Sequence, residues 1–238
     1  MVNNSDHALD RVVKKATSSG FINLPMSNAH SEDPRMVING KELLSFAFCN
    51  YLGLNHDARL KQGAIEQLLQ NGTFCSSSRT FLHLDLLEKA ENKVGQIFER
   101  PVVIVPKTTL GHFACMPILI GSKDAIILDQ QVHATIRLAA DTVRANGVVT
   151  HTIRHSRLDQ LEAKINELSG QVEHIWYMID GVFSMFGDDA PIEGIRQLMD
   201  KYPQLHLYVD DAHGMSWAGT HGRGRFLSKM DYHPRMFM

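Results

Sequence analysis

The sequence predicts an α/β fold with a mostly parallel sheet and helices on both faces. Stretches with the 3.6-residue apolar period of helices alternate along the chain with short runs rich in β-branched residues, which is the order of parallel βαβ units. An apolar run at 205–209 leads into Asp210, Asp211 and His213, and ligands of doubly wound sheets bind just outside such strand ends. The 238 residues suffice for one large domain or two small ones.

The composition is that of an ordinary globular protein. Hydrophobic residues make up 44%, charged residues 21%, and the formal net charge is −2, so neither nucleic acid nor an anionic membrane is an expected partner. Cys49, Cys75 and Cys115 are odd in number and widely spaced, which argues against a disulfide framework or a zinc site. The first residues lack a signal-peptide profile, and no apolar run approaches a membrane span. We therefore expect a cytoplasmic protein without a metal site.

The elements can be assigned in order from these patterns. Residues 1–44 are comparatively polar and are expected to form an amino-terminal arm. A helix is predicted over 58–70, ending before Gly72, and a second helix after Arg79, where Asp85 and Glu88 have capping-box spacing, ending before Pro101. Strands are expected at 102–105, 125–128, 148–152, 174–179 and 205–209. Further helices are predicted at 133–146 before Gly147, over the apolar stripe Leu158, Leu161, Ile165 and Leu168, and over Ile192, Ile195, Leu198 and Met199 after Pro191.

Asp210 and His213 carry the first prediction of a site. An acid three residues before an imidazole, at the end of a buried strand, is suited to a heteroaromatic cofactor. The carboxylate can pair with a protonated ring nitrogen, and the histidine can reach a neighbouring ring substituent. The alternative is an aspartate that caps the next turn and a histidine solvated in a loop.

Further segments extend this pattern in a fixed order. They are Asn-Tyr-Leu-Gly-Leu at 50–54, Asp-Gln-Gln-Val-His-Ala at 129–134, Asp-Gly-Val-Phe-Ser-Met-Phe-Gly-Asp at 180–188, Val-Asp-Asp-Ala-His-Gly at 209–214 and His-Gly-Arg-Gly at 221–224. With these segments the chain resembles the α-oxoamine synthase family of fold-type I pyridoxal-phosphate enzymes, over about residues 45–238. The resemblance implies a partial large domain of the aspartate-aminotransferase-like fold over 45–238, with the carboxyl-terminal small domain absent.

The resemblance also implies roles for the matching residues. Asp210 would pair with the pyridine nitrogen of pyridoxal 5′-phosphate (PLP), and His213, helped by Ser184, would bond the phenolic oxygen. His133 would lay its imidazole over the cofactor ring, with a helix-capping histidine as the alternative. Asp211 is expected to be structural.

Two segments depart from the pattern of the family. At 106–112 its glycine and aromatic residue are missing, so Thr108 and Thr109 are expected to bind the cofactor phosphate at a helix start. The segment 76–83, which shapes the substrate pocket in the family, offers Arg79 as a carboxylate ligand, with a surface arginine as the alternative. Asn50 matches the family's polar contact near the substrate, or simply forms a turn.

The function implied by the resemblance is a PLP-dependent acyl transfer. An amino acid and an acyl thioester of coenzyme A or acyl carrier protein would condense to an aminoketone in a homodimer. The Schiff-base lysine of the family is expected roughly thirty residues after Asp210, and the sequence ends before it at Met238, so we expect an amino-terminal portion that is inactive alone. An aminotransferase with the same cofactor is the nearer alternative. A non-catalytic truncated partner subunit or a relic is the alternative of another class.

Overall fold

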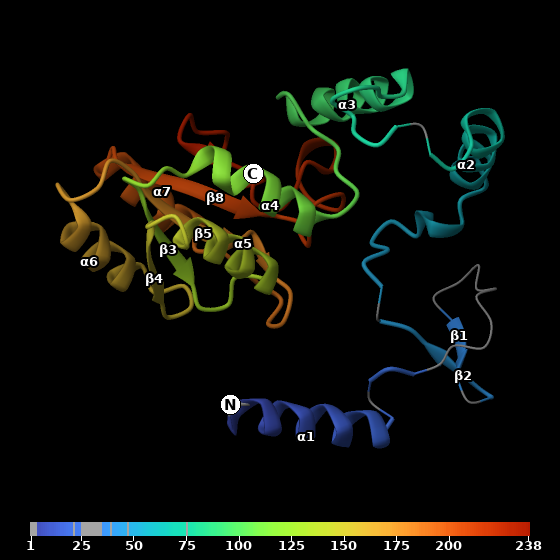
Figure 1. Cartoon of the computed structure of the whole chain (residues 1–238), viewed down its shortest axis with the longest axis horizontal. Coiled ribbons are helices and arrows are strands. Elements are labelled where there is room, and N and C mark those ends of the chain that lie inside the picture. Colours follow the sequence, from blue (N-terminus) through green and yellow to red (C-terminus); the bar gives the residue numbers. More distant parts are fainter. Residues whose placement is uncertain (1–3, 21, 25–34, 39, 47, 75) are drawn as a thin grey trace. The chain divides into compact units, whose positions relative to one another are not determined.

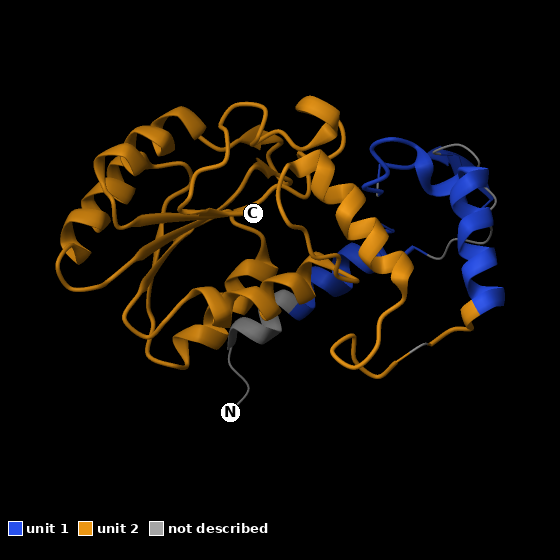
Figure 2. Ribbon diagram, turned by 90° about the horizontal axis from the view of Figure 1, so that it is seen from above, with its two compact units in different colours: residues 1–70 blue, residues 71–238 orange. Residues whose placement is uncertain are grey.

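The computed structural model describes residues 4–20, 22–24, 35–38, 40–46, 48–74 and 76–238, in two compact units, residues 1–70 and 71–238 (Figure 2). Cys75 lies outside the described residues, whereas Cys49 and Cys115 are free thiols. Within the described ranges, no helix has the length and apolar character that crossing a membrane requires. Much of the predicted arm over 1–44 also lies outside the described residues, so its boundary stays a prediction.

The first unit contains three features that the sequence analysis did not assign. These are the helix α1, an antiparallel hairpin of β1 and β2, and the 3-10 turn η1. The predicted helix over 58–70 is confirmed as α2, and Gly72 follows it with a φ of 73°. Its apolar stripe is exposed, with Ile65 and Leu68 each about half accessible. The elements of this unit are α1 (Asn4–Ser18), β1 (Arg35–Ile38), β2 (Lys41–Leu44), η1 (Leu54–His56) and α2 (Ala58–Asn71).

The second unit is built on a parallel sheet of order β4-β3-β5-β8-β9 (Figure 1). Its strands are β3 (Ala125–Asp129), β4 (Val149–Ile153), β5 (Ile175–Asp180), β8 (Leu205–Asp210) and β9 (Met236–Phe237). Its helices are α3 (Asp85–Phe98), α4 (Thr108–Leu119), α5 (Ala134–Arg144), α6 (Leu158–Leu168), α7 (Ile192–Lys201) and the 3-10 turn η2 (Thr220–Gly222). Four of the five predicted strands and all the predicted helices of this unit are therefore confirmed within a residue or two at their ends.

Helices cover both faces of this sheet, as predicted (Figure 1). Ile126 and Met178 point to the face where α4 and α5 pack. Their strand neighbours Ile127 and Tyr177 point to the opposite face, where the buried stripes of α6 and α7 pack. The split follows from the strand geometry, because successive side chains of a strand point to opposite faces. These two core layers confirm the α/β class.

Two local predictions are wrong. Residues 102–105 form no strand: Val103 is exposed, and the Ile104 N–H donates to a carboxylate oxygen of Glu91 at 2.8 Å instead of to a neighbouring strand. The predicted capping box at the start of α3 is also absent, because Leu84 occupies the N-cap position and no side chain caps the helix. Asp85 and Glu88 both lie in the first helical turn, where the helix dipole favours negative charge.

The connections between the strands indicate that a ligand would bind at the carboxyl end of the sheet. The chain leaves β3 for β4 on one side and returns to β5 on the other, so the strand order reverses between β3 and β5. Directly after β5 comes a short antiparallel hairpin of β6 (Val182–Phe183) and β7 (Asp188–Asp189). Ligands of open α/β sheets bind at such a reversal, outside the strand ends.

Candidate functional site

Three central strands of the sheet each end in an aspartate. Asp129 ends β3, Asp180 ends β5, and Asp210 ends β8, and Asp180 and Asp210 are partners in the register of the β5–β8 pair. All three carboxylates are largely withdrawn from solvent. Parallel strands that end in buried acids concentrate negative charge at this edge of the sheet.

Asp210 is held by a histidine that the sequence analysis did not single out. His112, on α4, lies with Nε2 3.0 Å from Asp210 Oδ2 and with Nδ1 2.8 Å from the Tyr208 hydroxyl oxygen. A carboxylate only accepts hydrogen bonds, so Nε2 carries a proton and donates it to Asp210. The other oxygen, Asp210 Oδ1, accepts the Ala212 N–H at 3.0 Å. The carboxylate is therefore fixed on both sides.

The charge state of Asp210 follows from these bonds. Burial by itself would raise the pKa of Asp210, but the hydrogen bonds of His112 and the Ala212 N–H outweigh burial and lower it. The neighbouring Asp180 has the opposite balance. Burial raises the pKa of Asp180 to about 7, the charges of Asp210 and Asp129 add to that rise, and the His133 N–H opposes it. Asp210 therefore ionises more readily than Asp180.

The side chain of Asp211 is buried and bonded within the protein, in agreement with the structural role expected from the sequence. Its Oδ2 accepts the Phe226 N–H at 2.8 Å, and its Oδ1 is buried without a hydrogen-bond partner in the described structure. A side chain added at Gly181, Gly214 or Gly224 would collide with this carboxylate. Burial raises the pKa of Asp211 to about 6.

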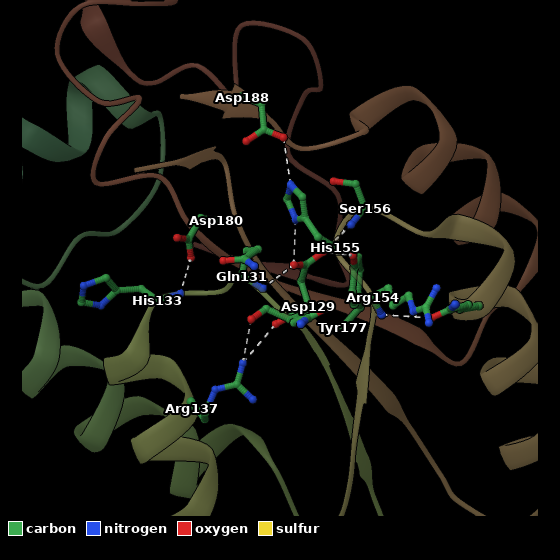
Figure 3. A network of polar contacts seen from close by, with 12 residues as sticks. Asp129, Gln131, His133, Arg137, Arg154, His155, Ser156, Tyr177, Asp180 and Asp188 are labelled. Atoms are coloured by element: carbon green, nitrogen blue, oxygen red, sulfur yellow. Dashed lines mark hydrogen bonds and ion pairs between the residues drawn. The ribbon is translucent and has the colours of Figure 1, made fainter. Parts of the chain in front are cut away.

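His133 follows the end of β3 and begins α5. Its N–H donates to Asp180 Oδ1 at 3.1 Å (Figure 3), and its Nδ1 lies 2.7 Å from Thr135 Oγ1 and accepts the Thr135 N–H at 3.4 Å. The helix-capping alternative therefore describes the ring as it stands. The stacking role of His133 stays a prediction, made at a position whose backbone contacts Asp180 beside Asp210.

The expected phosphate ligands lie at the start of a helix. Thr108 and Thr109 are the first two residues of α4, and Lys107 is the N-cap residue, with no side-chain cap. The first N–H groups of a helix have no partner within it, and the helix dipole adds partial positive charge there. His112 follows in the next turn, so its bond to Asp210 holds this helix start close to the end of β8.

His213 and Ser184 lie on the loops that leave the same strand ends. His213 is half-buried after β8, and its backbone oxygen accepts the indole N–H of Trp217 at 2.7 Å. Ser184 is exposed, in the loop between β6 and β7. Their joint contact with a ligand stays a prediction.

The two expected substrate ligands are engaged in local structure. Asn50 belongs to the first unit, where its side chain accepts the Asn55 N–H at 3.2 Å, as its turn-forming alternative describes. The guanidinium of Arg79 binds both carboxylate oxygens of Glu91, at 2.9 and 3.0 Å. These bonds lower the pKa of Glu91 to about 2. Arg79 does hold a carboxylate in two-point geometry, but this carboxylate belongs to the chain itself.

Two histidines complete the polar edge and were missed from the sequence. His112 appears there only within the 106–112 segment, and its partners Tyr208 and Asp210 are 96 and 98 residues away. His155 follows β4 and lies between the carboxylates of Asp129 and Asp188 (Figure 3). The position of His155 after a strand was the available signal, since residues after parallel strands meet at one edge.

Taken together, this edge can bind a flat ligand that carries a cation and an anion. The ionised Asp210 suits a protonated nitrogen, and the start of α4 suits a phosphate. Within the described part of the chain, no three or more His, Cys, Asp or Glu side chains are arranged to hold a metal ion.

Comparisons with known proteins identify the family of this chain. A family model for aminotransferases of class I and II matches residues 41–234. The 8-amino-7-oxononanoate synthase of Symbiobacterium thermophilum is 34% identical over 196 residues, which cover 80% of this chain and 48% of that protein. The serine palmitoyltransferase of Sphingobacterium spiritivorum is 32% identical over 223 residues, which cover 90% and 53%. The chain thus spans about half the length of the curated relatives it matches.

Solved structures resemble the fold. A serine palmitoyltransferase from S. paucimobilis with a bound PLP–myriocin aldimine gives a TM-score of 0.84 at 21% identity, covering 99% of this chain and 61% of that chain. The 8-amino-7-oxononanoate synthase of Francisella tularensis gives a TM-score of 0.59 at 23% identity, covering 77% and 49%. At these identities the likeness concerns the fold alone.

Proposed function

The chain belongs to the aminotransferase class I and II family, and from that membership we propose that it forms the PLP-binding part of a C-acyltransferase. The enzyme would condense an amino acid with an acyl thioester, of coenzyme A or of an acyl carrier protein, to an aminoketone. Relatives named as 8-amino-7-oxononanoate synthase and serine palmitoyltransferase support this class of reaction over transamination.

One observation carries the cofactor proposal. His112 joins the first turns of α4 to the end of β8, so a helix start and an ionised, buried carboxylate face the same edge of the sheet. PLP has a phosphate at one end and a pyridine nitrogen in its ring, and it needs an anion beside that nitrogen to keep it protonated. The donor set of this edge therefore fits PLP.

Each residue has a distinct task in this proposal. The bound cofactor supplies an electron sink for the bond broken at the amino acid's Cα. Asp210 holds the proton on the ring nitrogen, and His112 keeps Asp210 ionised and oriented. The N–H groups and hydroxyls of Thr108 and Thr109 bind the phosphate.

The remaining predicted ligands complete the ring contacts. His133 covers one face of the ring, while His213 and Ser184 donate hydrogen bonds to the phenolic oxygen. These donors favour the anionic form of that oxygen. We also propose a homodimer, on the basis of the family resemblance, and a cytoplasmic location, on the basis of the free thiols of Cys49 and Cys115.

Cofactor binding can be tested on this chain directly. PLP is titrated into the protein while the tryptophan fluorescence is followed, since one of the two tryptophans, Trp217, bonds the His213 backbone. We expect saturable quenching in the wild type and an affinity at least about tenfold lower in Asp210→Asn, because a neutral amide stabilises the ring proton less than a carboxylate does. Asp200→Asn, on the exposed side of α7, is the matched control and should bind PLP like the wild type. Absence of saturable binding, or equal affinity in Asp210→Asn, contradicts the proposal.

The reaction is tested on the protein expressed from its whole open reading frame. An amino acid and an acyl-CoA should together release free thiol and carbon dioxide. No thiol release across a panel of acyl donors rejects the acyltransferase. A keto-acid product formed without an acyl donor would indicate the aminotransferase instead.

A further inference from the structure

One imidazole connects the sheet to the hairpin that follows β5 (Figure 3). His155 Nδ1 lies 2.9 Å from Asp129 Oδ1, at the end of β3. On its other side, His155 Nε2 lies 2.8 Å from Asp188 Oδ2, at the start of β7. Two segments far apart in the sequence are thus bridged by a single ring.

The hairpin needs such a connection. Strands β6 and β7 form only two residue pairs, and a two-stranded hairpin of this size is marginal by itself. The His155 ring packs edge-on against Phe183, with centroids 4.4 Å apart, and stacks on Phe186 at 5.8 Å. These contacts hold both ends of the 184–187 loop, which carries Ser184.

Asp129 is a rigid anchor for the ring. It is fully buried, and its oxygens accept the N–H groups of Gln131 and Ser156 at 2.7 Å and the Tyr177 hydroxyl at 3.3 Å. These three hydrogen bonds fix the orientation of the carboxylate. Of the two sides of the His155 bridge, the hairpin side is the one that can move, although Asp189 of β7 is also bound by Arg225 and Lys229.

The bridge depends on the proton content of the ring. Both ring nitrogens face carboxylate oxygens, so only an imidazolium donates to both, whereas a neutral ring turns one lone pair against a carboxylate. Burial opposes this charge, but the hydrogen bonds to Asp129 and Asp188 prevail and raise the pKa of His155. The buried Asp180, at the end of β5, adds negative charge nearby only as the pH rises through its pKa of about 7. The guanidinium of Arg137 binds the backbone oxygen of Asp129 rather than its carboxylate.

We propose that His155 is a positioning residue whose imidazolium ties the 184–187 loop, and with it Ser184, to the carboxyl end of the sheet. The inference rests on the proposed function in so far as Ser184 is taken to contact PLP. Deprotonation of His155 removes one bond of the tie and releases the loop. The chain should then retain PLP better in mild acid than in mild base.

The first test needs no cofactor. Hydrogen exchange of the hairpin amides, which include the Gly187 and Ala190 N–H groups, is measured at pH 6 and pH 9 and corrected for the intrinsic rates. Protection should fall about tenfold or more between these values in the wild type, since a hydrogen bond to a charged group is lost. In His155→Gln it should be low at both values. His174→Gln is the matched control, because it removes a His–Asp pair of the same 2.9 Å length at the opposite end of the strands.

The second test measures the affinity for PLP at the same two pH values. PLP itself changes its protonation between these pH values, but it does so equally for every variant. The ratio of the wild-type affinity to the His155→Gln affinity therefore reports the effect of His155 alone. We expect a ratio of about ten at pH 6 that approaches one at pH 9. Asp188→Asn should reproduce both results, and its partly exposed side chain makes it the variant to use if His155→Gln does not fold.

The outcomes separate the two proposals. Equal hairpin protection in the wild type and His155→Gln at pH 6 overturns the tie, and so does an affinity ratio that does not change with pH. A wild type that never binds PLP, while the hairpin still loosens in His155→Gln, overturns the proposed function and leaves the tie.

Discussion

Replacing His112 with leucine removes the two hydrogen bonds that hold Asp210 and Tyr208, with little change in side-chain volume. The imidazole is almost fully buried, as are the side chains of both partners, so water cannot replace the lost bonds. A hydrogen bond to a charged group contributes about 1.5–3 kcal/mol, and a buried hydroxyl left without a partner costs about 1–3 kcal/mol. We therefore expect His112→Leu to lower the free energy of unfolding by about 3–5 kcal/mol at pH 7.

The loss should depend on pH in a definite direction. The pKa of Asp210 is depressed in the folded protein, so its bond to His112 contributes stability above the unfolded-state pKa, near 4, and loses it as the pH falls through the lower folded value. The deficit of His112→Leu should accordingly be largest near neutrality and shrink below about pH 4.

Urea unfolding followed by circular dichroism measures this deficit at each pH. Adding Tyr208→Phe to His112→Leu removes the stranded hydroxyl and should recover about 1–2 kcal/mol. His151→Leu, on the edge strand β4, is the matched control for the same exchange of side chains and should change stability by less than about 1 kcal/mol. A deficit below about 1 kcal/mol at pH 7, or one that persists unchanged in acid, would refute the reasoning.

Three further predictions concern the same unit and its neighbour. Gly181→Ala should destabilise by about 1–3 kcal/mol because its Cβ meets the Asp211 carboxylate, while Gly63→Ala, in open space on α2, should stabilise by about 0.5–1 kcal/mol; thermal unfolding compares them. The folded pKa of Asp180 is raised to about 7, so it makes stability fall as the pH rises from about 4 to 7, and Asp180→Asn should flatten that fall in denaturant titrations. Ile126→Ala should cost about 2–5 kcal/mol, whereas Val103→Ala should cost less than about 0.5 kcal/mol, because Ile126 is fully buried and Val103 is exposed.

The sheet could be predicted because its strands and helices are each encoded locally. A helical period is visible in the apolar stripes of α6 and α7, and short apolar runs mark β3, β5 and β8. All of these elements contribute residues to the core. The run at 102–105 has the same residue types, but among the described residues it pairs with no strand, which a local pattern cannot reveal. Likewise, the apolar period of α2 predicts a helix but does not reveal that its apolar face is exposed.

The sequence indicated the positions of residues that follow a strand and missed the contacts that are long-range. Asp210 lies at the strand end that the sequence indicated. His112 gains its role only through partners nearly a hundred residues away, and His155 through a carboxylate on each side. The local sequence also could not indicate that Glu91 engages Arg79, because that bond joins a loop to a separate helix.

The packing around Asp211 has a consequence for the evolution of this chain. Three glycines, at 181, 214 and 224, leave the space that one carboxylate fills, although they belong to three different segments. Contact with one carboxylate therefore limits three positions at once. A lineage that acquires alanine at 181 must also have shortened or displaced the side chain at 211, whereas at 214 the side chain of Arg225 must move as well, and at 224 the φ of 123° adds backbone strain.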